Sequence, residues 1–149
     1  MVSETDFSRQ PVGVFDSGVG GLSVLRELLH VLPQEDMVYL ADIAWAPYGE
    51  RSTDEIQSRS FAIADYLVER YHIKALVVAC NTATAQAAQE LRLRYPTLPL
   101  IGIEPAIKPA AALTRTGHIG IMATHGTVAS SKFQQLLHTW RGEHDVRVQ

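Results

Sequence analysis

The chain contains a single cysteine, Cys80, in a setting typical of a reactive thiol. An apolar run over residues 75–79 precedes it and the polar pair Asn81 and Thr82 follows, which predicts a junction between a strand and a helix. A helix N-terminus offers free N–H groups and partial positive charge, and both stabilise a thiolate, the reactive form of cysteine. The alternative is a structural role, because free cysteine is among the most buried residue types. The neighbouring residues must therefore decide between acid–base chemistry and packing.

Further polar side chains stand directly after the other predicted strands. In chain order they are Asp16 and Ser17, Asp42, Glu104, and Thr124 with His125. Since ligands of open parallel α/β sheets bind at the carboxyl ends of the strands, we expect several of these side chains around one crevice. Singly, each has a structural explanation: Asp16 can cap a turn and Thr124 can cap the following helix. Together with a thiol and an amide, they favour a functional site.

A glycine-rich turn separates the first predicted strand from the first predicted helix. Gly18, Gly20 and Gly21 permit positive φ angles and close approach of the backbone to an anionic ligand. A P-loop is excluded because Leu22, rather than lysine, follows Gly21. The dinucleotide fingerprint fails because Ser23 occupies the position of its third glycine. A small carboxylate or an amino acid remains a suitable ligand.

Strand and helix patterns alternate along the whole chain. Short apolar runs predict strands at residues 11–15, 37–41, 74–79, 98–103, 118–123 and 146–148. Apolar spacings of three and four predict helices at residues 22–32, 53–71, 82–95 and 126–140, and Ser52–Glu55 has the sequence of a capping box. This alternation predicts an α/β fold, a doubly wound parallel sheet flanked by helices. The proline-containing stretch 104–109 predicts a junction, so we expect a complete first lobe over residues 1–104 and an incomplete second lobe over residues 105–149.

Composition argues against several classes of partner. The formal net charge is −3 and no basic block is present, so nucleic acid is not an expected partner. No apolar run approaches the roughly 18 residues that span a membrane, and the polar start does not resemble a signal peptide. One cysteine cannot form an intrachain disulfide, which fits the cytoplasm. No metal is expected, because the six histidines show no ligand pair at a usual spacing; His125 alone stands at a strand end.

Four segments resemble the motifs of glutamate racemases, and they occur in the same order. They are residues Gly13–Val24, Ala46–Gly49, Ala79–Thr84 and Ala123–Val128. The resemblance spans about residues 11–137 of the chain. The wider group of aspartate, glutamate and hydantoin racemases shares the cysteine chemistry, whereas the first two motifs favour glutamate.

The resemblance implies a cofactor-independent racemase in a flavodoxin-like first lobe. In this family two cysteines face opposite sides of the substrate Cα; one thiolate removes the proton and the opposite thiol returns one. By motif match Cys80 would be one of the two, and Asp16 would help to set its protonation state and contact the substrate. The residues that would hold the ammonium and carboxylates of glutamate are Ser17, Pro47, Tyr48, Gly49, Asn81, Thr82 and Thr124. The implied role is the supply of D-glutamate for peptidoglycan.

The chain also departs from the family pattern. Family members are close to twice as long, and their second cysteine lies in a Gly-Cys-Thr-His motif that this sequence lacks. We therefore expect a truncated glutamate racemase that does not racemise alone, with Phe133, Leu136 and Trp140 facing a missing surface. The alternatives are another racemase of the family such as aspartate racemase, a non-catalytic module that binds acidic amino acids, and an interaction protein; a homo-oligomer is compatible with each.

Overall fold

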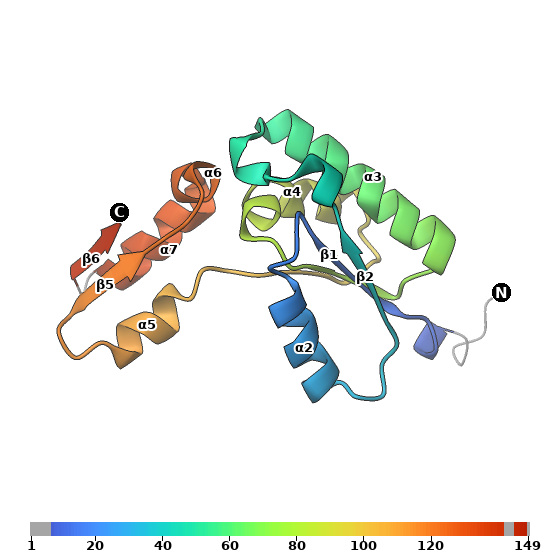
Figure 1. Ribbon diagram of the computed structural model, residues 1–149, viewed down its shortest axis with the longest axis horizontal. Coiled ribbons are helices and arrows are strands. Elements are labelled where there is room, and N and C mark those ends of the chain that lie inside the picture. Colours follow the sequence, from blue (N-terminus) through green and yellow to red (C-terminus); the bar gives the residue numbers. More distant parts are fainter. Residues whose placement is uncertain (1–6, 142–144, 149) are drawn as a thin grey trace.

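The computed structural model describes residues 7–141 and 145–148 and contains two parallel sheets, which lie in two parts of the molecule (Figure 1). The main sheet has the strand order β2-β1-β3-β4. Its strands are β1 (Val12–Asp16), β2 (Met37–Ala41), β3 (Ala75–Val78) and β4 (Leu100–Gly102). A smaller sheet pairs β5 (His118–Ile121) with β6 (Asp145–Val148). The predicted α/β fold with a parallel, helix-flanked sheet is therefore confirmed.

Helices cover both faces of the main sheet, with α2 on one face and α3 and α4 on the other (Figure 1). They are α2 (Leu22–Val31), α3 (Thr53–Tyr71) and α4 (Asn81–Arg94), and two short 3₁₀ turns, η1 (Ile43–Trp45) and η2 (Tyr48–Glu50), precede α3. The predicted capping box is present, because Ser52 accepts the Glu55 N–H and the Glu55 carboxylate accepts the Ser52 N–H. The sequence therefore places the start of α3 correctly.

The central strand β1 is buried along its whole length because both of its faces are covered. Val12 and Val14 pack towards α2, whereas Phe15 belongs to the larger core beneath α3 and α4. Strand β1 pairs with β2 and β3 in parallel register, so Asp16 lies opposite Ala41 and Phe15 lies opposite Val78. This register brings the polar residues that follow the three strands to one edge of the sheet.

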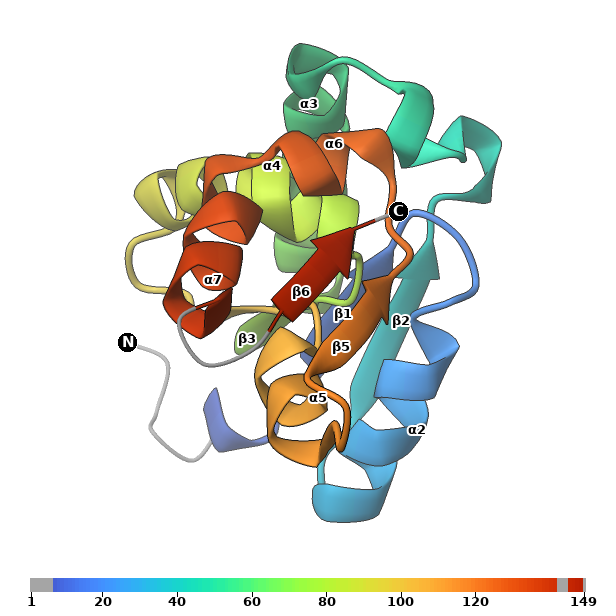
Figure 2. The ribbon, with the colours of Figure 1, turned by 90° about the vertical axis from the view of Figure 1, so that its left-hand side faces the viewer.

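The second sheet has a core of its own. Its helices are α5 (Ile107–Leu113), α6 (His125–Ala129) and α7 (Ser131–Arg141). Figure 2 shows β5 and β6 in front of the main sheet, with α7 to one side and α5 below. Phe133 is only 2% exposed and packs with Ile107 and Leu137, while Leu136 and Trp140 are partly buried against the same cluster. The expectation that Phe133, Leu136 and Trp140 face a missing surface is thus wrong for Phe133.

Two sequence boundaries differ in the structure. The single helix predicted over residues 126–140 is divided at Ser130, whose backbone is extended and whose hydroxyl accepts the Phe133 N–H at 3.2 Å. Serine competes with helix propagation in this way because its side chain caps a new helix. In the predicted junction, helix α5 already begins at Ile107, and Pro109 is tolerated because it lies in the first turn. The irregular segment between β4 and α5 is consequently confined to residues 103–106.

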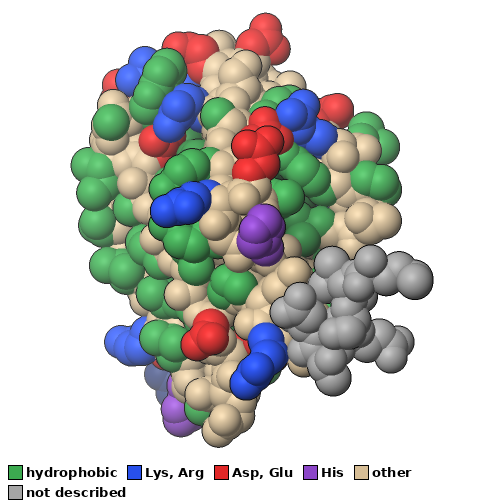
Figure 3. Space-filling model, turned by 90° about the vertical axis from the view of Figure 1, so that its right-hand side faces the viewer, with side chains coloured by type: hydrophobic (Ala, Val, Ile, Leu, Met, Phe, Trp, Pro, Cys, Tyr) green, Lys and Arg blue, Asp and Glu red, His purple; other side chains and the backbone are tan. Residues whose placement is uncertain are grey.

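The surface carries charges of both signs. On the face shown in Figure 3, lysine and arginine side chains alternate with aspartate and glutamate among hydrophobic side chains. None of the helices in the described part of the chain has the length and apolar character needed to cross a bilayer.

Candidate active site

Cys80 lies between β3 and α4, at the strand–helix junction that the sequence predicts. It is the N-cap residue of α4, and its sulfur accepts the Ala83 N–H at 3.4 Å. The Ser17 hydroxyl, which follows β1, is hydrogen-bonded to the same sulfur at 3.3 Å. Cys80 is only 7% exposed. Both hydrogen bonds can be donated to the sulfur of a thiolate, the form in which cysteine acts as a base.

Asp16 caps the glycine-rich turn that follows β1, which is the structural role that the sequence allows. Its carboxylate accepts the Gly21 N–H at 2.8 Å and is buried. A Cβ atom on Gly21 would lie 2.8 Å from the Cβ of Asp16 and 3.0 Å from that of Ala79, so close approach requires glycine there. The positive φ angles that glycine permits are not adopted at Gly18, Gly20 or Gly21. The turn therefore requires glycine at position 21 because a side chain would not fit there, and not because the backbone is left-handed.

Tyr39 of β2 lies beside this turn. Its hydroxyl donates to the Gly18 carbonyl at 3.2 Å. Burial raises the pKa of Tyr39 above its ordinary value, and the charge and hydrogen bonding of Asp16 and the charge of Cys80 raise it further. The phenol is thus held in its protonated form next to the two groups predicted to carry the chemistry.

Tyr48 is buried, and its hydroxyl is already occupied. It donates to a carboxylate oxygen of Asp42 at 2.7 Å, and its ring lies 6.4 Å from that of Phe15 between centroids. Burial raises the pKa of Tyr48, and its hydrogen bond to Asp42 raises it further. The hydroxyl of Tyr48 is therefore engaged within the protein, whereas Pro47 is exposed and Gly49 is half-buried.

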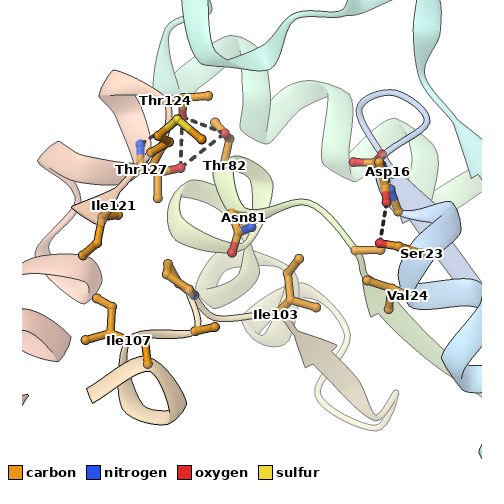
Figure 4. A pocket seen from close by; sticks show the side chains of 18 of the residues that line it. Asp16, Ser23, Val24, Asn81, Thr82, Ile103, Ile107, Ile121, Thr124 and Thr127 are labelled. Atoms are coloured by element: carbon orange, nitrogen blue, oxygen red, sulfur yellow. Dashed lines mark hydrogen bonds between the residues drawn. The ribbon is translucent and has the colours of Figure 1, made fainter. Parts of the chain in front are cut away.

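Three threonine hydroxyls join the two parts of the molecule. Thr82, at the start of α4, is hydrogen-bonded to Thr124 at 2.9 Å and to Thr127 at 3.4 Å, and Thr124 is hydrogen-bonded to Thr127 at 3.0 Å (Figure 4). Thr124 caps α6, as the sequence allows, by accepting the Thr127 N–H. A Cβ on Gly49 would lie 2.6 Å from the Thr124 Cγ2. Thr124 thus contacts both α4 and the loop that carries Gly49.

A cavity of about 640 Å³ lies between the two sheets. Asn81 lies between the Asp16 side and the Thr124 side of this cavity (Figure 4). The predicted site residues among its lining are Asp16, Asn81, Thr82 and Thr124. Large apolar side chains complete it: Val24, Ile103, Ile107, Ile119, Ile121 and Met122. Cys80, Ser17, Pro47, Tyr48 and Gly49 lie outside this lining, so the structure divides the predicted residues between the cavity and its margin.

Sequence reasoning missed two residues of the site. Thr127 lies within the quoted threonine motif, three positions after Thr124, and this spacing on a capped helix was the available signal. Tyr39 had no such signal, since it is an ordinary residue of a strand. His125 is exposed at the start of α6, and residues 7–141 and 145–148 contain no cluster of three or more acidic, histidine or cysteine side chains suited to a metal.

Replacing Thr127 by valine should lower the free energy of unfolding by about 1–3 kcal/mol, because the buried Thr82 and the Thr124 hydroxyl would each lose a hydrogen bond. Urea denaturation followed by circular dichroism measures this change. The matched control is Thr139→Val on α7, where an exposed hydroxyl donates to the Gln135 carbonyl and a change within about 0.5 kcal/mol is expected. Equal losses in the two variants would contradict a special role for the threonine cluster.

Comparison with known proteins supplies the family context. The sequence profile of the Asp/Glu/Hydantoin racemase family matches residues 12–147. A glutamate racemase of Ectopseudomonas mendocina is 57% identical over 141 residues, which are 95% of this chain and 52% of that protein. The chain therefore spans about half the length of the curated relatives it matches.

Solved structures show the same relationship. Escherichia coli glutamate racemase, in complex with L-glutamate and the activator UDP-MurNAc-ala, aligns with a TM-score of 0.86 at 42% identity, covering 93% of this chain and 52% of that one. Francisella tularensis glutamate racemase, in complex with D-glutamate, aligns with a TM-score of 0.76 at 33% identity over 94% of this chain and 52% of that one. Profile, sequences and structures agree, and the chain belongs to the Asp/Glu/Hydantoin racemase family.

Proposed function

We propose that this chain is part of a glutamate racemase, that it binds glutamate, and that Cys80 is the acid/base group for one side of the substrate Cα. The observation that carries the proposal is the position of the Cys80 sulfur, which caps α4 and is hydrogen-bonded to Ser17 at 3.3 Å. The relatives named glutamate racemase and the two glutamate complexes support glutamate over another amino acid.

In the proposed reaction the Cys80 thiolate removes the Cα proton. The new S–H bond forms as the C–H bond breaks, and the electron pair of that bond remains on the substrate as a carbanion-like state. Because an amino acid Cα–H is a very weak acid, aligned hydrogen bonds and exclusion of water must stabilise this state. Ser17, Asn81, Thr82 and Thr124 would hold the ammonium and carboxylates, and Asp16 would influence the charge of the thiol.

The complete racemisation reaction needs more than Cys80. Inversion requires a second acid/base group on the opposite side of Cα, and the 149 residues contain one cysteine. We therefore expect proton exchange without inversion in this chain. The division into lobes at residues 1–104 and 105–149, a cytoplasmic location and the supply of D-glutamate for peptidoglycan are part of the same proposal, as the family implies.

Hydrogen exchange at the substrate tests the proposal. The purified chain is incubated in D₂O with L-glutamate and, separately, with D-glutamate, and deuterium at Cα is followed by proton NMR or mass spectrometry. We expect deuterium to enter one enantiomer and not the other, because one base serves one face. A folded chain that binds glutamate without exchange would instead be a binding module, and inversion at a rate equal to exchange would contradict the single-base account.

A further inference from the structure

A charged and aromatic network lies beneath the loop that carries Gly49. Arg59 of α3 donates through Nε to Asp42 Oδ2 at 3.0 Å and through Nη2 to Asp42 Oδ1 at 2.7 Å. Tyr48 donates its hydroxyl to Asp42 Oδ2 at 2.7 Å. Asp42 is buried, so both of its carboxylate oxygens are occupied away from solvent. These three residues are called the Arg59–Asp42–Tyr48 network below.

Apart from the packing of η2 against α4 and α6, the loop is anchored mainly through Tyr48, which is part of the main core. Among residues 43–50, every side chain is exposed or half-buried except that of Tyr48. The loop consists of two 3₁₀ turns of three residues each, and neither has a side-chain cap. Short 3₁₀ segments have weaker hydrogen-bond geometry than an α-helix. The position of the loop is therefore decided largely by what holds Tyr48.

Arg59 contacts the same loop at a second point. Its guanidinium carbon lies 4.9 Å from the ring centroid of Trp45, and that of Arg51 lies 5.5 Å from the same ring. Arg51 also donates to the Trp45 carbonyl at 3.4 Å. Arg59 thus fixes the first turn through Trp45 and the second through Asp42 and Tyr48.

The chain of contacts continues to the threonine cluster. Gly49 follows Tyr48 in the chain. It lies so near Thr124 that a Cβ added to it would be 2.6 Å from Thr124 Cγ2. A displacement of Tyr48 must therefore move Gly49 relative to Thr124. Small displacements of groups that contact a substrate have large effects on binding and rate.

We infer that Arg59 is a positioning residue, which holds Gly49 against Thr124 through the Arg59–Asp42–Tyr48 network and its contact with Trp45. The inference deepens the proposed function, on which it rests, because Gly49 and Thr124 are expected to contact glutamate. The planar guanidinium is required for the two parallel bonds to Asp42, and the point charge of lysine supplies only one of them.

The charge of Asp42 supports this arrangement. Burial raises the pKa of Asp42, but hydrogen bonds from Arg59 and Tyr48 and the charge of Arg59 outweigh it and bring the pKa below its ordinary value. The hydrogen bond and charge of Asp42 also raise the pKa of Arg59 despite its partial burial. The carboxylate therefore remains ionised at neutral pH and accepts all three bonds.

The test compares Arg59→Ala and Arg59→Lys with a matched control, Arg94→Ala, in the 149-residue chain. Arg94 also forms a bidentate pair, with Asp65, and its guanidinium lies 5.3 Å from the Phe61 ring, but it belongs to α4 and these two partners belong to α3. Two readouts are used. Amide hydrogen exchange at Arg51, whose N–H donates to the Tyr48 carbonyl, reports on the loop, and calorimetry gives the Kd for each glutamate enantiomer.

Arg59→Ala should accelerate amide exchange at Arg51 and weaken glutamate binding, each by about tenfold or more. Arg59→Lys should shift both readouts in the same direction by less, and Arg94→Ala should leave both within about twofold of the unsubstituted chain. Equal behaviour of Arg59→Ala and Arg94→Ala in the loop readout would overturn the inference. If the unsubstituted chain binds no glutamate, the proposed function fails, while amide exchange still decides whether Arg59 holds the loop.

Discussion

Replacing Cys80 by serine should lower the rate of deuterium exchange at the glutamate Cα by about 10²- to 10⁴-fold. Serine is nearly isosteric and can keep the contacts to Ser17 and the Ala83 N–H, but its hydroxyl does not ionise near neutral pH. A thiol has an ordinary pKa of about 8.5, within reach of the values that suit a general base. The measured quantity is the initial rate of deuterium incorporation into the reactive enantiomer in D₂O.

Two controls separate chemistry from folding. Circular dichroism and urea denaturation should show that Cys80→Ser retains the fold. Ser58→Ala, at an exposed position of α3, should exchange at the unsubstituted rate. If Cys80→Ser retained more than about a tenth of the exchange rate, a different group would be the base, and the assignment of Cys80 would be wrong.

Replacing Asp42 by alanine should lower the free energy of unfolding by about 3–5 kcal/mol. The substitution removes the acceptor of both guanidinium bonds and leaves the buried Tyr48 hydroxyl without its partner. Removing Asp42, whose side chain is 6% exposed, is costly because the charge of Arg59, at 29% exposed, is then only partly solvated. Urea denaturation at neutral pH, monitored by circular dichroism, gives the difference between the two proteins.

Asp65→Ala is the matched control, since Asp65 also accepts a bidentate arginine but at the surface. The side chains of Asp65 and Arg94 are 35% and 50% exposed, and a loss of about 1 kcal/mol or less is expected there. A loss at Asp42 no larger than that at Asp65 would show that the Arg59–Asp42–Tyr48 network contributes little to stability.

The same variant has a defined pH dependence. The folded pKa of Asp42 lies below its unfolded value of about 3.9, so its stabilising effect is complete above that value. As the pH falls through the folded pKa, the carboxylate takes up a proton and this part of the stability is lost. The difference in unfolding free energy between the unsubstituted chain and Asp42→Ala should therefore shrink as urea titrations are repeated below about pH 4.

The sequence by itself determined most of the elements and the position of its cysteine, but not helix α5 or the division between α6 and α7. Strand and helix periodicities, the Ser52–Glu55 capping box and the turn at Cys80 all depend on residues a few positions apart, so they can be recognised without knowing the fold. Parallel pairing of the strands then follows from the alternation of these elements, which is why polar residues after β1, β2 and β3 could be expected at one edge.

The tertiary structure alone decided which side chains meet and which are already occupied. Ser17 reaches Cys80 across 63 residues, Thr82 reaches Thr124 across 42, and Arg59 reaches Asp42 across 17. Such pairings depend on packing angles and side-chain directions that no local pattern encodes. For the same reason the sequence did not show that the Tyr48 hydroxyl is engaged with Asp42, a contact it forms because a buried polar group must find a partner.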